Sequence, residues 1–233
     1  MRQGRVKHAA TAAASASLSL AQLVMVPHGR TPSNEKLLFQ GHREGPEGQL
    51  LPQSLRDAAT GAAAFLASDL GSELKRAPSR FVFLRSPLQR AAQTADAYLR
   101  AIGEAGLPVP DVEVDSGLLE IDHSAWHGWS AEEMHGDEGA AARAYRHGSF
   151  FAKPIGGESN LELLARCDAW LAERSSRHAG KVVVCFGHGT FQNAAEVLLR
   201  TLGATEPKRV FSRRPGESHL RRGFAHRVYP PLA

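Results

Sequence analysis

Two histidines, His28 and His188, each stand at the end of a short apolar run and directly before a glycine. Residues 23–27 and 182–186 have the length and composition of buried strands, and Pro27 cannot donate a hydrogen bond to a neighbouring strand. If the two strands are parallel neighbours, both imidazoles reach the same edge of one sheet. Two facing imidazoles can hold an anion, one attacking it and the other stabilising it.

Arg90 and Glu120 are of the types that would complete such chemistry. Arg90 falls in the first turn of a helix expected after the second strand, where a guanidinium can bind two phosphate oxygens at once. Glu120 follows a further strand at the same expected edge, and a partly desolvated carboxylic acid there can protonate a leaving group. Gly29 lets the backbone approach a ligand closely, and Gly189 lies where the following helix adds its N-terminal dipole to the same pocket.

The elements that must position these residues alternate between strands and helices. Hydrophobic patterning predicts strands at residues 23–27, 81–84, 112–114 and 182–186, and helices at residues 55–70, 88–102, 130–145, 158–171 and 191–202. Gly71 is expected to close the first helix, and a Ser130/Glu133 capping box to open the third. An edge strand is expected near residues 218–220 or 225–228. These units predict an α/β fold, a three-layer α/β/α sandwich with a mostly parallel central sheet, in which ligands bind at the carboxyl ends of the strands.

The expected organisation is a single domain over residues 23–233 after a flexible or helical extension at residues 1–22, which contains no acidic residue. Residues 32–49, rich in Gly, Pro, Asn, His and Arg, are interpreted as a long loop over the strand edge. The irregular, aromatic-containing segment and helix at residues 120–156 are interpreted as a lid.

Composition restricts the class of protein. The chain has 233 residues, of which 42% are hydrophobic and 22% charged, as in an ordinary globular domain, and no segment has the apolar length of a membrane span. Cys167 and Cys185 are the only cysteines, which favours a reducing compartment and hence the cytoplasm. The net charge of +4 comes largely from basic residues within the segment 208–227. This run is expected to be solvated surface rather than a nucleic-acid face, although a basic cleft for an anionic small molecule fits equally well.

A metal site is not expected. His123 and His127 have the spacing of two metal ligands on a helix, but the segment is irregular and no third ligand is evident. Lining of the substrate pocket is the favoured role for His127.

Five short motifs follow one another along the chain: Pro27-His28-Gly29-Arg30-Thr31 with Asn34; Ser86-Pro87-Leu88-Gln89-Arg90 through Ala95; Leu119-Glu120 with Trp126-His127-Gly128; Gly156-Gly157-Glu158-Ser159; and Gly187-His188-Gly189. In these motifs residues 23–202 resemble the histidine phosphatase superfamily, which includes cofactor-dependent phosphoglycerate mutases and their phosphatase relatives.

The resemblance implies a role for individual residues. His28 would be the nucleophile that becomes phosphorylated, which splits one transfer into two steps. His188 and Arg90 would bind the transferring phosphoryl group with the help of Asn34, and Glu120 would be the proton donor. Neither a metal nor another cofactor is needed, because imidazoles, a guanidinium and helix ends supply the positive field.

One departure from the family pattern bears directly on this site. The family has a phosphate-binding arginine where this chain has Pro27, and the missing contact is worth about 1.5–3 kcal/mol. Arg85, or with less support Arg30 or Arg43, is expected to refill the positive site. The alternative for Arg85 is exposure to solvent or pairing with a carboxylate.

The sequence thus favours a phosphomonoester hydrolase that acts on a small phosphorylated metabolite through a phosphohistidine at His28. A phosphatase is preferred to a mutase because the segment between Glu120 and Gly156 is short for the lid that mutases use. Two alternatives stay open: acid–base chemistry on a substrate that is not a phosphate ester, and a degenerate anion-binding protein. Expected partners are a small phosphorylated or anionic substrate, with no nucleic acid and no membrane, and a homodimer is left open.

Overall fold

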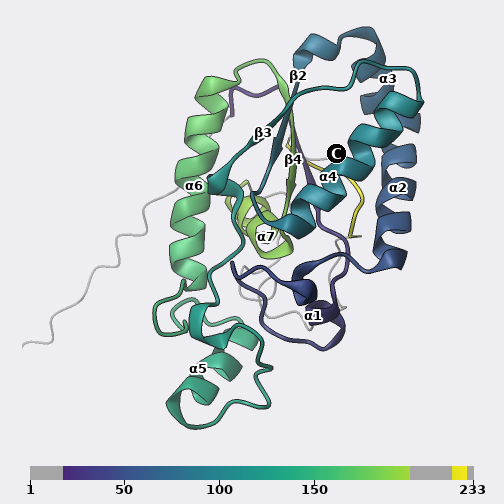
Figure 1. The fold of residues 1–233 in the computed structure, drawn as a ribbon. Coiled ribbons are helices and arrows are strands. Elements are labelled where there is room, and N and C mark those ends of the chain that lie inside the picture. The colour runs from purple at the N-terminus through teal and green to yellow at the C-terminus, as the bar shows by residue number, and fades with distance from the viewer. Residues whose placement is uncertain (1–17, 200–221, 230–233) are drawn as a thin grey trace, which may run out of the picture.

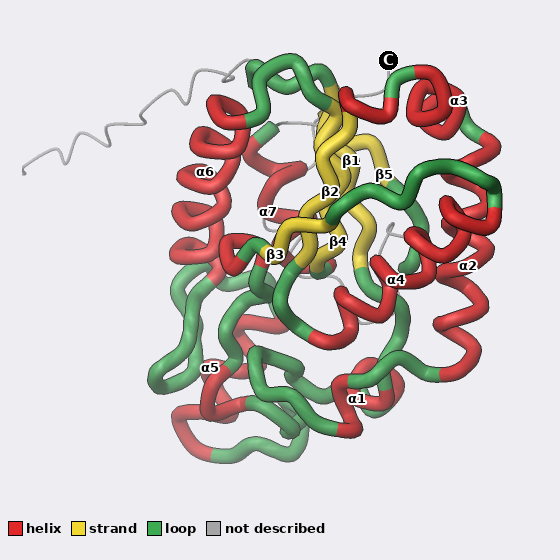
Figure 2. The backbone as a smooth tube through the Cα atoms, turned by 45° about the horizontal axis from the view of Figure 1, so that its top comes forward, coloured by secondary structure: helices red, strands yellow, loops and turns green. Residues whose placement is uncertain are grey.

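The structure, a computed structural model, describes residues 18–199 and 222–229 and, for residues 227–229, the backbone alone. Within this part of the chain, one five-stranded sheet has the order β3-β2-β4-β1-β5 (Figures 1 and 2). Its strands are β1 (Gln22–Pro27), β2 (Phe81–Arg85), β3 (Val112–Val114), β4 (Val182–Gly187) and β5 (His226–Tyr229). The first four are parallel, and β5 runs antiparallel to β1. The predicted α/β fold with a mostly parallel sheet is confirmed.

Helices cover both faces of this sheet (Figure 2). One face carries α2 (Pro52–Ala67), α3 (Asp69–Arg76) and α4 (Gln89–Glu104), and the other carries α6 (Asn160–Arg177) and α7 (Gly189–Leu198). The connections contain α1 (Pro32–Glu35), α5 (Gly136–Arg146) and four 3-10 turns, η1 (Pro46–Gly48), η2 (Pro78–Arg80), η3 (Ser116–Leu118) and η4 (Ser124–Trp126).

The two central strands are apolar on both sides because helices pack on both faces. Successive side chains of a strand point to opposite faces. Accordingly Val24 and Val26 belong to the core under α2 and α4, whereas Leu23 and Met25 belong to the core under α6 and α7. Every residue of β4 is buried. These two cores fix β1 and β4 rigidly and therefore fix the residues that follow them.

The helix expected at residues 55–70 is in fact two helices. α2 ends at Ala67, and Ser68 then caps α3 by accepting a hydrogen bond from the Gly71 backbone N–H at 3.5 Å. Serine is a preferred N-cap residue, so it starts a new helix where the apolar spacing alone predicts a continuation. Gly71 consequently lies inside α3 rather than closing the helix before it, and that prediction was wrong.

The helix expected from Ser130 begins later, at Gly136. The capping contacts do form, since the Ser130 N–H donates to Glu133 at 2.9 Å and the Glu133 N–H donates back to Ser130 Oγ at 3.2 Å. They close a turn, however, and not the first turn of α5. The expected loop at residues 32–49 likewise contains α1 and η1.

The ends of the chain are described in part. Residues 1–17 of the expected N-terminal extension lie outside the described residues, whereas Leu18 and Leu20 are buried in the core beside α6 and α7. Of the two positions expected for an edge strand, residues 218–220 lie outside the described residues, and residues 225–228 overlap β5. No helix among the described residues combines the length and apolar character needed to cross a membrane.

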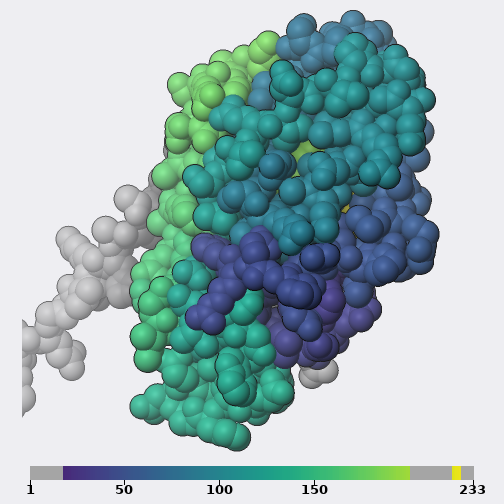
Figure 3. Space-filling model, in the orientation of Figure 1, coloured from purple at the N-terminus to yellow at the C-terminus, as the bar shows by residue number. Residues whose placement is uncertain are grey.

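The loop between β1 and α2 packs against the segment expected to form a lid. Phe39 contacts Trp126 and Tyr145, with ring centroids 5.1 and 5.9 Å away. Arg146 lies over the Phe39 ring at 4.3 Å and donates a hydrogen bond to the Leu37 carbonyl. Figure 3 shows the purple surface of this loop against the teal surface that includes α5. The two segments therefore form one continuous wall at this end of the sheet.

Candidate active site

The fold brings His28 and His188 together. β1 and β4 are neighbours whose register pairs Pro27 with Gly187, so the next residue on each strand is a histidine. The His28 N–H donates to the Gly187 carbonyl at 2.9 Å, and the imidazole centroids lie 5.2 Å apart with the rings inclined by 62°. Both side chains are buried. The two parallel strands thus place both imidazoles at the same edge of the sheet.

The ring of His28 is held in one tautomer. Its Nδ1 lies 2.6 Å from the Gly29 carbonyl oxygen, which can only accept, so Nδ1 carries the proton and Nε2 keeps its lone pair. Burial lowers the pKa of His28 well below its ordinary value, and the positive charges of Arg222 and Arg90 lower it further. The imidazole is therefore neutral at pH 7, the form in which it is nucleophilic.

Gly29 itself is packed tightly. Its N–H donates to Thr94 Oγ1 at 3.2 Å, and a Cβ placed on it would lie 2.9 Å from the Cβ of Ser54. A side chain at this position would push α2 away from the nucleophile loop. The glycine after His28 is thus required by the close approach of α2.

His188 is held from the neighbouring strand. Its Nε2 lies 2.8 Å from the Ser86 hydroxyl, and that hydroxyl accepts the Leu88 N–H at 3.3 Å. The Nδ1 atom of His188 is buried without a hydrogen-bond partner among the described residues. Burial lowers the pKa of His188 well below its ordinary value, with further lowering by Arg90 and His28.

Arg90 is a fully buried guanidinium in the first turn of α4. Its Nη2 donates to the Gly41 carbonyl at 3.1 Å, whereas Nε and Nη1 are buried with no partner among the described residues. Burial lowers the pKa of Arg90 to about 10, and the carboxylates of Glu120 and Glu44 oppose that lowering. The side chain stays charged at pH 7 and offers two donors for an anion.

Glu120 is buried between the strand edge and α7. Oε1 accepts the N–H of Ile121 at 3.0 Å, and Oε2 accepts the N–H of Thr190, in the first turn of α7, at 3.4 Å. The Glu120 backbone carbonyl accepts from His42 Nε2 at 2.6 Å. The carboxyl is thereby fixed beside the first turn of α7, and its negative charge opposes the lowering of the Arg90 pKa.

Asn34 and His127 are the next site residues predicted from the sequence, and both contact the surrounding loops. Asn34 Oδ1 accepts the Thr31 N–H at 3.2 Å, which orders the turn after the nucleophile loop. His127 Nδ1 accepts the Gly41 N–H at 3.2 Å. Burial lowers the pKa of His127, as do the charges of Arg43 and Arg90, so its ring lies at the cationic side of the site.

Three arginines were expected from the sequence to supply a positive charge beside His28. Arg85 is half-buried and donates to the Ser86 carbonyl at 3.3 Å. Arg30 and Arg43 are exposed. None of these three is among the charges that lower the pKa of His28. The last site residue named from the sequence, Gly189, opens α7 directly after His188.

Sequence reasoning missed Arg222. It was counted only in the C-terminal basic run, yet it precedes Gly223, whose N–H donates to the Pro27 carbonyl at 2.7 Å. The positive charge of Arg222 acts on both His28 and Arg90. No local pattern could have found it, because its position depends on a strand that runs antiparallel to β1 and begins beside the residues where β1 ends.

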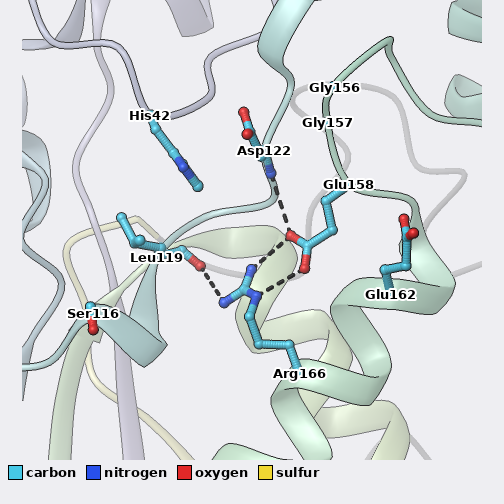
Figure 4. Close-up of a pocket in the computed structure, with 9 residues that line it drawn as sticks. All are labelled: His42, Ser116, Leu119, Asp122, Gly156, Gly157, Glu158, Glu162 and Arg166. Atoms are coloured by element: carbon cyan, nitrogen blue, oxygen red, sulfur yellow. Dashed lines mark hydrogen bonds and ion pairs between the residues drawn. The ribbon is translucent and has the colours of Figure 1, made fainter.

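A pocket of about 300 Å³ has Leu119 and Asp122, which stand on either side of Glu120 in the sequence, in its wall (Figure 4). Its walls are His42, Ser116, Leu119, Asp122, Gly156, Gly157, Glu158, Glu162 and Arg166. Arg166 forms two hydrogen bonds to the Glu158 carboxylate, at 2.8 and 2.9 Å, and donates to the Leu119 carbonyl at 3.0 Å. The Arg166 charge is therefore used to hold the pocket wall.

The described residues contain no group of three or more histidine, cysteine, aspartate or glutamate side chains arranged for a metal ion. His123 instead belongs to an aromatic cluster with Phe39, Trp126 and Tyr145. Burial lowers the pKa of His123 to about 3.

Comparison with known proteins identifies relatives over most of the chain. The phosphoglycerate mutase of Nitrobacter winogradskyi, described as 2,3-bisphosphoglycerate-dependent, is 29% identical over 196 residues, which cover 82% of this chain and 85% of the relative. Phosphoserine phosphatase 1 of Hydrogenobacter thermophilus is 27% identical over 169 residues, covering 72% of this chain and 71% of the relative.

Solved structures show the same fold. A mycobacterial glucosyl-3-phosphoglycerate phosphatase in complex with VO3 matches with a TM-score of 0.59 at 23% identity, over 88% of this chain and 90% of that one. A phosphoserine phosphatase from Entamoeba histolytica in complex with phosphoserine matches with a TM-score of 0.62 at 22% identity, over 88% of each chain. Residues 23–214 match the model of the histidine phosphatase superfamily, branch 1. This match covers well over half of the chain, which therefore belongs to that superfamily.

Proposed function

We propose that this protein is a phosphomonoester hydrolase that acts on a small phosphorylated metabolite through a phosphohistidine at His28. The observation that carries the proposal is the neutral His28 ring, with Nδ1 bonded to the Gly29 carbonyl, facing His188 at 5.2 Å. Two unpartnered donors of the buried Arg90 support it, since a phosphoryl group is the kind of ligand that satisfies them.

In the first step, Nε2 of His28 attacks phosphorus, and the bond from phosphorus to the ester oxygen breaks. Glu120, which must hold a proton once the ester is bound, gives that proton to the oxygen, so an alcohol leaves. In the second step, water attacks the phosphohistidine and the nitrogen–phosphorus bond breaks. The proton from water goes to the Glu120 carboxylate, and inorganic phosphate is released with the acid regenerated.

Positive groups hold the phosphoryl oxygens through both steps. Arg90 offers Nε and Nη1 as two unpartnered donors on different edges of its guanidinium, and α7 begins directly after His188. Ser86 fixes the tautomer of His188 if its hydroxyl donates to Nε2, because Nδ1 then carries the proton and becomes a donor. Each such charge-assisted hydrogen bond contributes about 1.5–3 kcal/mol.

The substrate is expected to be a small phosphate ester like those in the names of the relatives. The relatives' names point to phosphoglycerates, phosphoserine and glucosyl-3-phosphoglycerate as the first esters to test. Hydrolysis is favoured over mutase action because the segment between Glu120 and Gly156 is short. Acid–base chemistry without phosphoryl transfer is the second candidate, and Pro27 is the observation that favours it. A cytoplasmic location stays a prediction, as does a homodimer.

Rapid-quench assays test the hydrolase directly. The protein is mixed with p-nitrophenyl phosphate labelled with 32P and stopped in alkali, which preserves phosphohistidine, and label on the protein is measured. His28→Ala is expected to remove the label, whereas the matched variant His147→Ala, at an exposed histidine, is expected to keep it. Absence of a phosphoenzyme with this ester and with the three natural esters named above would contradict the proposal and favour the second candidate.

A further inference from the structure

The strand β5 returns the chain to the nucleophile. It runs antiparallel to β1, with Met25 paired with His226, so the residues just before β5 lie beside the end of β1. The Gly223 N–H donates to the Pro27 carbonyl at 2.7 Å. Arg222 is therefore attached directly to a residue that is hydrogen-bonded to the position before His28.

The guanidinium of Arg222 lies within the charged cluster of the site. Its Nη1 is buried and has no hydrogen-bond partner among the described residues. Its charge acts on His28, Arg90 and, more weakly, His188, and the Glu120 carboxylate is the largest charge favouring its ionised form. A buried cationic donor without a partner is costly, so it is expected to bind an anion.

The turn that carries Arg222 is tightly anchored. The Gly223 carbonyl accepts a hydrogen bond from the Tyr98 hydroxyl at 2.9 Å, and Gly223 has a φ of +79°, a conformation that favours glycine. A Cβ on Gly61 would lie 2.1 Å from the Gly223 carbonyl oxygen. The turn therefore sits against α2 and α4 without room for a side chain at either glycine, which limits the positions that Arg222 can adopt.

The other cationic candidates are less well placed. Arg85 donates to the Ser86 carbonyl, and Arg43 is exposed. Arg30 is close enough for its charge to lower the pKa of Arg222, but its side chain is exposed, whereas Nη1 of Arg222 is buried. Pro27 has neither a cationic side chain nor a backbone N–H. Arg222 supplies a guanidinium from the turn before β5, next to Pro27.

We infer that Arg222 binds the phosphoryl oxygens at His28, in place of the cationic side chain that Pro27 lacks. This inference rests on the proposed function, because it takes the ligand of the site to be the phosphoryl group that His28 receives. The site would then hold its phosphoryl group between Arg90 on α4 and Arg222 before β5.

Binding of orthovanadate, which needs no turnover, tests the inference separately from the hydrolase. Isothermal titration of the full chain compares wild type with Arg222→Gln, Arg222→Lys and the matched variant Arg56→Gln, at an exposed arginine on α2. Arg222→Gln is expected to weaken binding about 10- to 100-fold, as loss of one charge-assisted hydrogen bond predicts. Arg222→Lys is expected to recover part of that loss, and Arg56→Gln to bind like wild type.

Phosphoenzyme formation is measured on the same proteins. If Arg222→Gln binds vanadate within twofold of wild type, the inference is overturned, while label on His28 would still support the hydrolase. If vanadate binding depends on Arg222 but no phosphoenzyme forms, the hydrolase fails and the anion-binding role of Arg222 stands. If wild type binds no vanadate, both are overturned.

A measurement on the unmutated protein covers the case in which Arg222→Gln does not fold. Arginine side-chain resonances of the 15N-labelled wild type are followed by NMR during titration with inorganic phosphate, with the Arg222 signal assigned by its loss in Arg222→Lys. The Arg222 resonance is expected to shift together with that of Arg90. A shift of Arg90 without any shift of Arg222 would refute the inference.

Discussion

Replacement of Arg90 by glutamine is expected to abolish anion binding while leaving the fold as stable as before. The charge of Arg90 opposes folding, because burial lowers its pKa to about 10. At about 1.36 kcal/mol per pKa unit, that lowering corresponds to about 3 kcal/mol. Glutamine removes this penalty and can still donate to the Gly41 carbonyl, which now accepts from Nη2 at 3.1 Å. Lost packing of the longer side chain offsets part of the gain.

The expected unfolding free energy of Arg90→Gln in urea is therefore equal to that of wild type or higher by up to about 2 kcal/mol. The expected loss of activity is large. Two donors, Nε and Nη1, are without a protein partner, and two charge-assisted hydrogen bonds are worth about 3–6 kcal/mol. The ratio kcat/KM is expected to fall about 10²- to 10⁴-fold.

Urea unfolding with and without inorganic phosphate measures stability and anion binding on one protein, and kcat/KM is measured separately with a phosphate ester. Wild type is expected to gain stability with phosphate, because a ligand that binds only the folded state shifts the equilibrium toward it. Arg90→Gln should gain none, and Arg56→Gln should behave like wild type. The reasoning is refuted if Arg90→Gln loses more than about 3 kcal/mol of unfolding free energy and still responds to phosphate, since Arg90 would then be a structural residue.

Three further predictions concern which groups in and around the site carry protons. Glu120→Gln is expected to lower kcat/KM for phosphoserine about 10²- to 10⁴-fold. The loss with p-nitrophenyl phosphate is expected to be much smaller, because nitrophenolate leaves without a proton. Equal losses of kcat/KM with both esters would argue against a proton donor at Glu120. Ser86→Ala removes the hydroxyl 2.8 Å from His188 Nε2 and should lower kcat/KM about tenfold, with Ser86→Thr restoring it; an unchanged rate in Ser86→Ala contradicts the tautomer assignment. Folding lowers the pKa values of His28, His188 and His123 below those of the unfolded chain. Below about pH 6.5 the unfolded state therefore binds more protons than the folded state. The unfolding free energy is expected to fall as the pH drops, by about 1.4 kcal/mol per pH unit for each histidine. His123→Phe should remove about 1.4 kcal/mol per pH unit of that slope in urea titrations between pH 6.5 and 5. An unchanged slope would show that folding does not lower the pKa of His123.

The central strands and their histidines were accessible from the sequence because a strand buried on both faces needs a continuous apolar run. Such runs precede His28 and His188, and a glycine follows each histidine, so a purely local pattern marked both residues. That the two strands are neighbours depends on strand order, which local spacing does not encode.

Helix boundaries depended on contacts that compete with the hydrophobic pattern. The apolar spacing runs past Ser68, but its capping hydrogen bond starts a new helix there. At Ser130 the capping pair formed without the helix, because the same two hydrogen bonds also close a turn. One local motif is compatible with either structure, and the packing of the following residues decides between them.

Arg222 was out of reach for a different reason. Nothing in its neighbours distinguishes it from the other arginines of the basic run. Its position follows from the antiparallel pairing of β5 with β1 and from the close packing of Gly223 on α2, both of which are long-range contacts. Arg85 was the natural local candidate because it stands next to the Ser86 turn, yet its guanidinium bonds to the backbone beside it.

The hydrogen bond between Gly223 and Pro27 also has a consequence for the order in which the protein becomes functional during synthesis. Of the site residues described here, Arg222 is the last to leave the ribosome, and it cannot reach Pro27 until β5 has added to the edge of a sheet whose other strands are already made. A nascent chain can therefore position His28, Arg90, Glu120 and His188 before it acquires its second guanidinium. If Arg222 binds the phosphoryl group, full affinity for that group arises only when β5 docks. A growing chain would hold its substrate weakly until that point.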